Sequence, residues 1–200
     1  NQSIALAKAG VEVYHAGLIG EEGEILLKTC QEGGVDSRYI RKTTEKSGHT
    51  IIQVDKDGQN CILLYGGANQ SITREYVDEV LSHFEKGDIL LLQNEINLLD
   101  YIINQAYEKG MMIILNPSPY NEKLDSCDFK KISMLLLNEV EGAQVTGEKD
   151  EKKILVRLKE LYPDMQVVLT LGKDGSVYQY KDQVYRQGIF SVQAVDTTAA

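Results

Sequence analysis

Cysteine is scarce in this chain. Its 200 residues include three cysteines, Cys30, Cys61 and Cys127, which are odd in number and far apart in the sequence. This pattern excludes a disulfide framework, which needs paired cysteines, and a metal site built from clustered cysteines. We therefore expect reduced thiols and a cytoplasmic protein.

Positive charge and long apolar runs are also lacking. Against 30 acidic residues the chain has 21 lysines and arginines, which gives a formal net charge of -9. Such a charge opposes non-specific attraction to nucleic acid or anionic lipid, although a local basic pocket for phosphates remains compatible with it. No apolar run approaches the ~20 residues of a membrane-spanning helix. We expect neither nucleic acid nor a membrane as a partner.

Two common nucleotide-binding fingerprints are absent. The sequence contains no Walker motif, and the glycines Gly17, Gly20 and Gly23 lack the G-x-G start of a dinucleotide-binding loop. Glu21 and Glu22 would also place negative charge beside any phosphate bound there. A dinucleotide cofactor at this loop is therefore disfavoured.

The sequence does contain an alternation of short apolar runs and amphipathic segments. The apolar runs are typical of strands covered on both faces of a sheet, and they occupy residues 89–92, 112–115, 132–137 and 167–171. Residues 97–109 and 150–162 each place their apolar side chains on one helical face. The alternation predicts an α/β fold with a three-layer α/β/α arrangement and right-handed crossovers.

A hairpin pattern interrupts this alternation. Residues 47–54 and 60–65 are β-prone, and the Asp57-Gly58 pair between them favours a tight hairpin turn. An isolated two-stranded ribbon is only marginally stable, so it must pack on the main domain, on additional strands or on another subunit. We predict that the hairpin lies outside the main α/β domain.

Polar and glycine residues follow several of the predicted strands. Glu95 comes shortly after the run 89–92, and ligands of open α/β sheets gather at the carboxyl ends of strands, so Glu95 is well placed to touch a substrate. The glycine-rich turn at residues 172–175 lets main-chain N–H groups approach a ligand closely, and phosphates are the usual ligands. The carboxylate of Glu95 also has an ordinary explanation, because the start of a helix favours negative charge without any ligand.

Three spaced motifs carry a resemblance to a known family. They are N-E-V-E at residues 138–141, T-L-G-K-D-G at residues 170–175 and V-D-T-T-A-A at residues 195–200. The N-Q-S of residues 1–3 and the N-P-S-P of residues 116–119 add further matches. Together they resemble the ribokinase family of ATP-dependent carbohydrate kinases, also called the PfkB family, over essentially the whole chain.

The resemblance implies a ribokinase-like three-layer α/β/α sheet with a small β lid. Residues 1–45 would form the first part of the main domain, residues 46–66 the lid hairpin, and residues 67–200 the rest of the main domain with the start of the nucleotide-binding region. In the family the lid covers the sugar and often pairs with its counterpart, so a homodimer through the lid is expected. The implied reaction is phosphoryl transfer from ATP to a sugar hydroxyl, with ribose giving ribose 5-phosphate as the first choice.

The resemblance also implies site residues, each at the matching position of a family motif. Sugar binding is assigned to Asn1 and Glu95. ATP binding is assigned to Asn138, Thr170, Gly172 and Gly175. The magnesium environment is assigned to Glu141, and a monovalent cation, K⁺, to Asp196 and Thr198. The implied cofactors are therefore ATP, Mg²⁺ and K⁺.

The family's catalytic base is the last residue of a D-T-x-x-x-G-D motif. Here the match stops at Ala200, before the Gly-Asp. We therefore expect a chain truncated at both ends, with no catalytic base among its residues and with extremely slow phosphate transfer or none. Two alternatives stay open: a non-catalytic nucleotide- or sugar-binding domain, and a family kinase that acts on another sugar or on a nucleoside.

Overall fold

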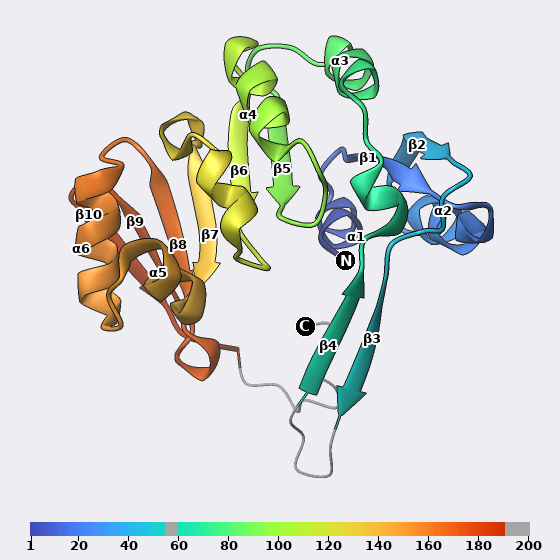
Figure 1. The fold of residues 1–200 in the computed structure, drawn as a ribbon. Helices are drawn as coiled ribbons and strands as arrows, with labels where there is room; N and C mark the ends of the chain where they lie inside the picture. Colours follow the sequence, from blue (N-terminus) through green and yellow to red (C-terminus); the bar gives the residue numbers. More distant parts are fainter. Residues whose placement is uncertain (55–59, 191–200) are drawn as a thin grey trace. The chain divides into compact units, whose positions relative to one another are not determined.

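The computed structural model describes residues 1–54 and 60–190. They form two compact units, with the described residues up to Val80 in unit 1 and the described residues from Leu81 onward in unit 2. Among the described residues, unit 1 contains two sheets of two strands each, and unit 2 contains one sheet of six strands (Figure 1).

Unit 1 contains a strand, a helix and a parallel strand after a short first helix. Its first elements are α1 (Gln2–Lys8), β1 (Tyr14–Ile19), the 3-10 turn η1 (Glu21–Gly23), α2 (Glu24–Glu32) and β2 (Asp36–Lys42). The two strands pair in parallel. The hydroxyl of Tyr76 donates to the carbonyl of Tyr39 at 2.6 Å and lies 3.3 Å from that of Gly17, so it joins the two strands. Burial raises the pKa of Tyr76 to about 12, which keeps this donor protonated.

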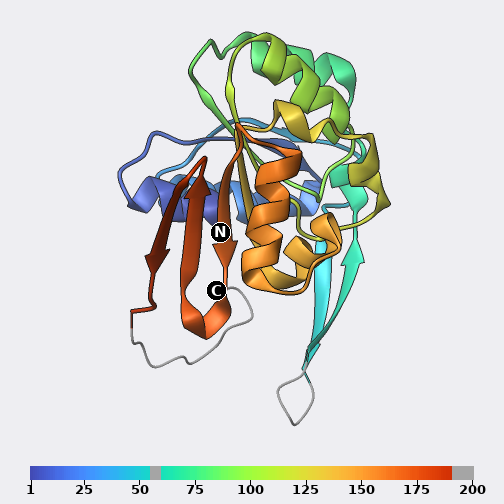
Figure 2. The ribbon, with the colours of Figure 1, turned by 90° about the vertical axis from the view of Figure 1, so that its left-hand side faces the viewer.

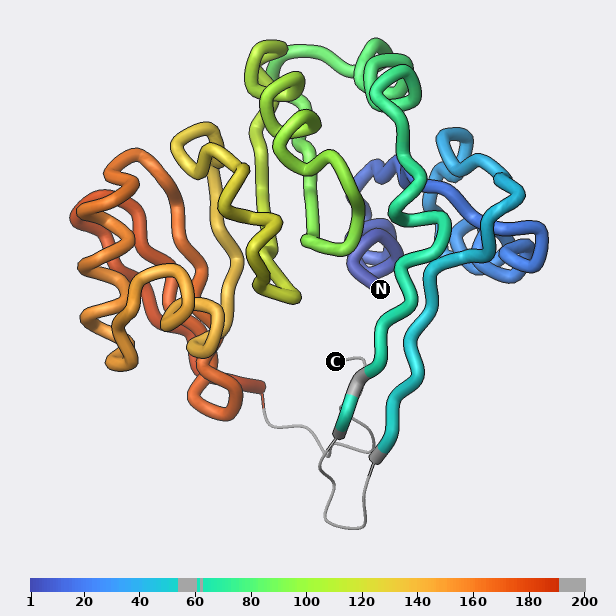
Figure 3. The backbone as a smooth tube through the Cα atoms, viewed as in Figure 1, coloured from blue at the N-terminus to red at the C-terminus, as the bar shows by residue number. Residues whose placement is uncertain are grey.

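The predicted hairpin is present and forms a sheet of its own. β3 (His49–Val54) pairs antiparallel with β4 (Asn60–Tyr65), and the six-stranded sheet contains neither strand. The predicted Asp57-Gly58 turn lies outside the described residues. Figure 3 shows the two strands running side by side, away from the rest of unit 1. The lid boundaries at residues 46–66 and the lid role stay predictions.

The outgoing end of the hairpin is fastened by two hydrogen bonds. Gly20 donates its backbone N–H to the Ser47 hydroxyl at 2.8 Å, and Ser47 donates its own N–H to the Glu22 carboxylate at 2.7 Å. Hydrogen bonds from the backbone of Glu22 itself and from that of Ser47 hold the pKa of Glu22 below its usual range. The loop after β1 therefore fixes the point where the hairpin begins.

The returning end is fastened to the same place. After β4, the turn η2 (Gly67–Gln70) leads to α3 (Arg74–Ser82). Ala68 donates its N–H to the Lys46 carbonyl at 2.8 Å. Gly67, at a φ of +47°, packs so closely on that carbonyl that a side chain would collide with it. The base of the hairpin is therefore tightly packed backbone.

Unit 2 is built on a mixed sheet in the order β10-β9-β8-β7-β6-β5. The strands are β5 (Ile89–Gln93), β6 (Met112–Asn116), β7 (Met134–Asn138), β8 (Gln166–Thr170), β9 (Ser176–Tyr180) and β10 (Gln183–Gln187). The strands from β5 to β8 are parallel, whereas β9 pairs antiparallel with β8 and β10 pairs antiparallel with β9. The parallel strands lie in chain order, so right-handed crossovers put the intervening helices on one face.

Figures 1 and 2 show the helices of unit 2 together on that face. They are α4 (Leu99–Glu108), α5 (Glu139–Thr146) and α6 (Glu151–Leu161), with the 3-10 turns η3 (Glu122–Ser126) and η4 (Phe129–Lys131) before β7. Aliphatic side chains fill the core of this unit, and the fully buried ones include Ile103, Ile113, Leu115, Leu124, Leu135, Ile154, Leu158, Val167, Leu169 and Val177. The predicted α/β class is confirmed.

The sequence patterns and the observed elements agree best in unit 2. Each predicted apolar run there overlaps one strand from β5 to β8. The sequence does not predict β2, because its residues D-S-R-Y-I-R-K are mostly polar or charged and show no apolar run. None of the described helices combines the length and the apolar character needed to cross a bilayer.

Candidate functional site

The four parallel strands of unit 2 end in polar, uncharged residues. β5 ends at Gln93, β6 at Asn116, β7 at Asn138 and β8 at Thr170. Gln93 is the register partner of Asn116, and Asn138 is the register partner of Thr170. The carboxyl ends of parallel strands meet at one edge of a sheet, so these residues form a row. They line a cleft of about 170 Å³ together with Ser118, Leu136, Leu137 and Glu141.

Asn138 and Glu141 are joined by reciprocal hydrogen bonds at the start of α5. Asn138 Oδ1 accepts from the N–H of Glu141 at 2.9 Å, and Glu141 Oε2 accepts from the N–H of Asn138 at 3.0 Å. This capping box satisfies two N–H groups that a helix start otherwise leaves unpaired. It also holds the Glu141 side chain, only 7% exposed, in one orientation at the wall of the cleft.

The capping box leaves the second carboxylate oxygen of Glu141 available to a ligand. Among the described residues only Oε2 takes part in a hydrogen bond, and the residues that line the cleft include no lysine or arginine. The described residues contain no cluster of three or more His, Cys, Asp or Glu side chains that could hold a metal by themselves. Protein-bound Mg²⁺ is commonly held by one or two carboxylates, with phosphates and waters completing its shell. The donor set therefore fits a magnesium ion that arrives with a nucleotide phosphate.

The turn after β8 contains two glycines with different surroundings. Gly172 opens the 3-10 turn η5 (Gly172–Asp174) at a φ of +53°, and nothing lies within 4 Å of the place where its Cβ would be. Its main chain is thus open to a ligand. Gly175 has a φ of +90°, and a Cβ there would collide with the carbonyl of Gln187 at the end of β10. Gly175 therefore has a packing reason to be glycine, whereas its contact with ATP stays a prediction.

The two predicted sugar contacts lie in different units. Glu95 is exposed and follows Asn94, which donates its N–H to the Ser118 carbonyl at 3.1 Å and its side-chain Nδ2 to the Pro119 carbonyl at 2.6 Å. The loop that carries Glu95 is thus held against the loop after β6. Asn1 occupies the N-cap position of α1 without a side-chain capping hydrogen bond. Their pairing around one sugar stays a prediction.

Three residues predicted from the motifs come together in the cleft, namely Asn138, Glu141 and Thr170. Their roles toward ATP and Mg²⁺ stay predictions. Gln93 lines the same cleft, although no motif in the sequence singles it out; its place directly after an uninterrupted apolar run was the available signal. Asp196 and Thr198, the predicted K⁺ site, lie outside the described residues.

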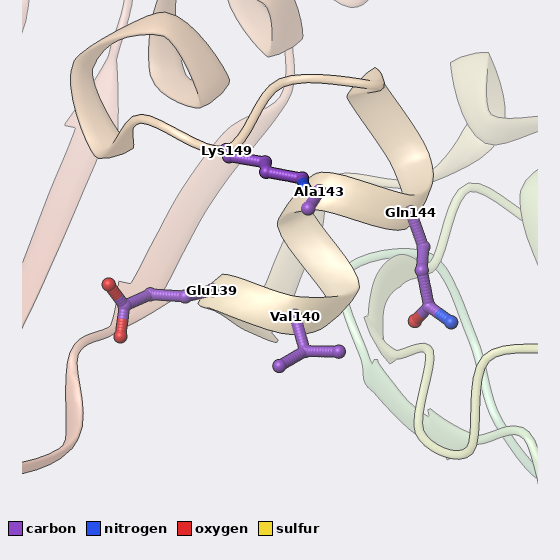
Figure 4. Close-up of a pocket in the computed structure, with 5 residues that line it drawn as sticks. All are labelled: Glu139, Val140, Ala143, Gln144 and Lys149. Atoms are coloured by element: carbon purple, nitrogen blue, oxygen red, sulfur yellow. The ribbon is translucent and has the colours of Figure 1, made fainter.

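A second hollow lies along α5, but its polar groups do not converge. It has a volume of about 390 Å³ and is lined by Glu139, Val140, Ala143, Gln144 and Lys149. Figure 4 shows the Glu139 and Gln144 side chains pointing to opposite sides, with Val140 between them. Ligand sites combine concavity with polar groups that face a common point. The strand-end cleft is therefore the better candidate, although the hollow is larger.

Known proteins are similar to this chain over its whole length. The ribokinase of Staphylococcus aureus (strain COL) is 31% identical to this chain over 215 residues, and the match covers 100% of this chain and 68% of that protein. The pfkB family of carbohydrate kinases matches the whole of residues 1–200.

Solved structures agree with this similarity. A ribokinase from Cryptococcus neoformans var. grubii serotype A, in complex with ADP, has a TM-score of 0.84 and 26% identity over 98% of this chain and 69% of its own. Arabidopsis thaliana ribokinase, complexed with ribose and ATP, has a TM-score of 0.80 and 26% identity over 98% of this chain and 68% of its own. The predicted ribokinase-like fold is therefore confirmed, and the chain belongs to the pfkB family of carbohydrate kinases.

Proposed function

We propose that this protein is an ATP-dependent sugar kinase that transfers the γ-phosphoryl group of ATP to a hydroxyl of ribose, giving ribose 5-phosphate. The observation that carries the proposal is the capping box, which fixes Asn138 and Glu141 at the wall of a cleft that Thr170 also lines. Phosphoryl transfer asks little covalent chemistry of a protein and depends on positioning and on stabilisation of charge. The Arabidopsis thaliana ribokinase solved with ribose and ATP supports the choice of substrates.

In this proposal the cleft receives the phosphate end of the nucleotide. Asn138 and Thr170 bind it from the strand ends, and the main chain of Gly172 and Gly175 binds it from the turn after β8. Glu141 holds a magnesium ion or its waters through the carboxylate oxygen that the capping box leaves available. When bound, that ion would neutralise the negative charge on the phosphoryl oxygens.

The remaining roles come from the resemblance. Asn1 and Glu95 bind the sugar, Asp196 with Thr198 holds K⁺, and the protein acts in the cytoplasm. No residue within 1–200 is assigned as the general base. A coupled ADP-release assay on residues 1–200, beside a version extended at both ends, tests that assignment. Comparable turnover by the two would place the base within these 200 residues.

Sugar-dependent ADP release by the full-length protein is the test of the activity. We expect turnover with ribose to exceed turnover with fructose or with a nucleoside. Binding of nucleotide and sugar without turnover would instead support the binding-domain alternative. A preference for fructose or a nucleoside would retain the kinase activity and correct the acceptor. Loss of all ADP release, with no nucleotide binding, would contradict the whole proposal.

We also propose that the protein forms a homodimer through the hairpin. Ile51 and Leu63 are register partners on one face of the ribbon, and they are 55% and 53% exposed. A two-stranded ribbon with an exposed apolar pair gains stability when that pair is buried. The pairing of lids within the family supports a second copy of the chain as the surface that covers it.

A further inference from the structure

The side chains at the four strand ends differ in how they are held. Three of them have a local hydrogen bond: Asn138 Oδ1 accepts from the N–H of Glu141 at 2.9 Å, Asn116 Oδ1 accepts from the N–H of Ser118 at 3.0 Å, and the Thr170 hydroxyl donates to the carbonyl of Leu137 at 3.4 Å. The side-chain amide of Gln93, which lines the same cleft, makes no hydrogen bond with another described residue. Among these four residues, Gln93 therefore has the amide whose donors and acceptor are available to a ligand.

The backbone of Gln93 is nevertheless well fixed. Gln93 ends β5 in register with Asn116 of β6. The next residue, Asn94, is 4% exposed and is bonded through its N–H and its side chain to the loop after β6. A side-chain amide on a fixed main chain, with no hydrogen bond to another described residue, is suited to contact a ligand. Only its side-chain rotamer has to be ordered on binding, so the entropy cost is small.

The chemistry of the cleft indicates which ligand group this amide meets. The lining residues include one carboxylate and no lysine or arginine, so the phosphate charge must be met by a metal ion and by neutral donors. A side-chain amide offers two N–H donors to phosphate oxygens and one acceptor to a metal-bound water. We propose that Gln93 is a further binding residue of the cleft, and that its amide contacts the metal–phosphate group of the nucleotide. This inference rests on the proposed kinase function.

Calorimetric titration of the full-length protein with Mg·ADP tests the proposal without relying on turnover. We expect Gln93→Leu, which keeps the bulk and removes the amide, to weaken Mg·ADP binding roughly 10-fold, as for the loss of one hydrogen bond to a charged group. Gln93→Asn keeps an amide on a shorter side chain and should lose less. Gln183→Leu, on the exposed strand β10, is the matched control and should bind as the wild type does.

The outcomes separate this inference from the function on which it rests. Wild-type affinity for Mg·ADP in a folded Gln93→Leu protein would overturn the role of Gln93 and leave the kinase proposal intact. A rise in the KM for ribose with unchanged Mg·ADP affinity would also overturn it, since Gln93 would then be a sugar contact. A wild-type protein that binds no Mg·ADP would overturn both. If Gln93→Leu does not fold, Gln93→Met, which is similar in length and has no amide, replaces it, and wild-type Mg·ADP affinity of that variant would reject the contact.

Discussion

The strand-end cleft of unit 2 and the hairpin of unit 1 are stabilised in different ways. In the cleft, local hydrogen bonds orient polar side chains before any ligand arrives, as the capping box does for Glu141. In the hairpin, the fastening lies at the base, at Ser47 and Lys46, whereas Ile51 and Leu63 farther along are exposed. A site for phosphates gains from dipoles that are already oriented, whereas an apolar ribbon gains from the surface that buries it. Substitutions in the cleft should therefore change activity, and those in the hairpin should change stability and association.

The largest expected effect comes from the charge of Glu141. Glu141→Gln keeps an acceptor for the N–H of Asn138, because Gln also completes a capping box, but it removes the carboxylate from the cleft. We expect kcat/KM to fall ~10²- to 10³-fold while Tm hardly changes, by analogy with the loss of one preorganised electrostatic contact. Glu141→Ala should in addition lose about 0.5–1.5 kcal/mol of stability, since it removes the acceptor of the part-buried hydrogen bond from the N–H of Asn138. Full activity of Glu141→Gln would show that the reaction does not need the negative charge of Glu141.

The base of the hairpin should respond through stability. Gly67→Ala combines a left-handed φ of +47° with a collision against the Lys46 carbonyl, so we expect a loss of ~3 kcal/mol or more in the free energy of unfolding. The matched control is Gly10→Ala, where φ is +86° but nothing lies within 4 Å of the added Cβ. The free energy of unfolding of this control should fall by only about 1–2 kcal/mol, which is the cost of placing a Cβ on a left-handed backbone. Equal urea midpoints for the two variants would argue against the close packing of Gly67.

A smaller effect should appear as a pH dependence at the same base. The pKa of Glu22 in the folded protein is lowered from its ordinary value of 4.5 by hydrogen bonds from its own backbone and from Ser47. A carboxylate whose pKa is lower in the folded than in the unfolded protein stabilises the fold at pH values above its unfolded-state pKa. This stabilisation is lost as pH falls through the folded-state pKa. The Tm difference between the wild type and Glu22→Gln should therefore shrink between about pH 5 and about pH 3.

The matched control for this measurement is Glu108→Gln. Glu108 is exposed on α4 of unit 2, away from the hairpin in the sequence. Its Tm difference from the wild type, measured over the same pH range, gives the background against which the Glu22→Gln difference is compared. A constant difference for Glu22→Gln would mean that the hydrogen bond to Ser47 adds no stability.

The smallest effect on folding is expected at the exposed apolar pair. Leu63→Ser should change the stability of the isolated chain by no more than about 0.5 kcal/mol, as for most surface substitutions. It should nevertheless weaken self-association, which sedimentation over a range of protein concentrations would measure. Ile25→Ser on α2 replaces another exposed apolar side chain and should leave association unchanged. If Leu63→Ser and Ile25→Ser both self-associate as strongly as the wild type does, the hairpin is not part of the dimer interface.

The sequence predicts the parallel strands well and the polar contacts poorly. The runs that become β5 to β8 are apolar without interruption, which distinguishes them from the amphipathic segments between them, although in β6, β7 and β8 buried positions alternate with half-buried ones. β2 escapes prediction, since its residues are half-buried or exposed and alternate without a clear period. Asn138, Glu141 and Thr170 can be found from motifs, and the structure brings them to one cleft. That Oε2 of Glu141 accepts the hydrogen bond from Asn138 while the other oxygen has no bond to a described residue depends on atomic distances, which no pattern of residue types contains.

Glu141 serves the start of a helix with one oxygen and faces the cleft with the rest of its carboxylate. If Glu141 binds the metal as proposed, helix initiation and ligand binding depend on the same side chain, and thermodynamic linkage makes such coupling reciprocal. In the proposed site, fraying of the first turn of α5 should weaken the binding of a metal–phosphate group, and a bound nucleotide should protect that turn from opening. We therefore expect the amide proton of Asn138 to report on the occupancy of the cleft, because its hydrogen exchange should slow when a ligand holds the carboxylate that accepts its hydrogen bond.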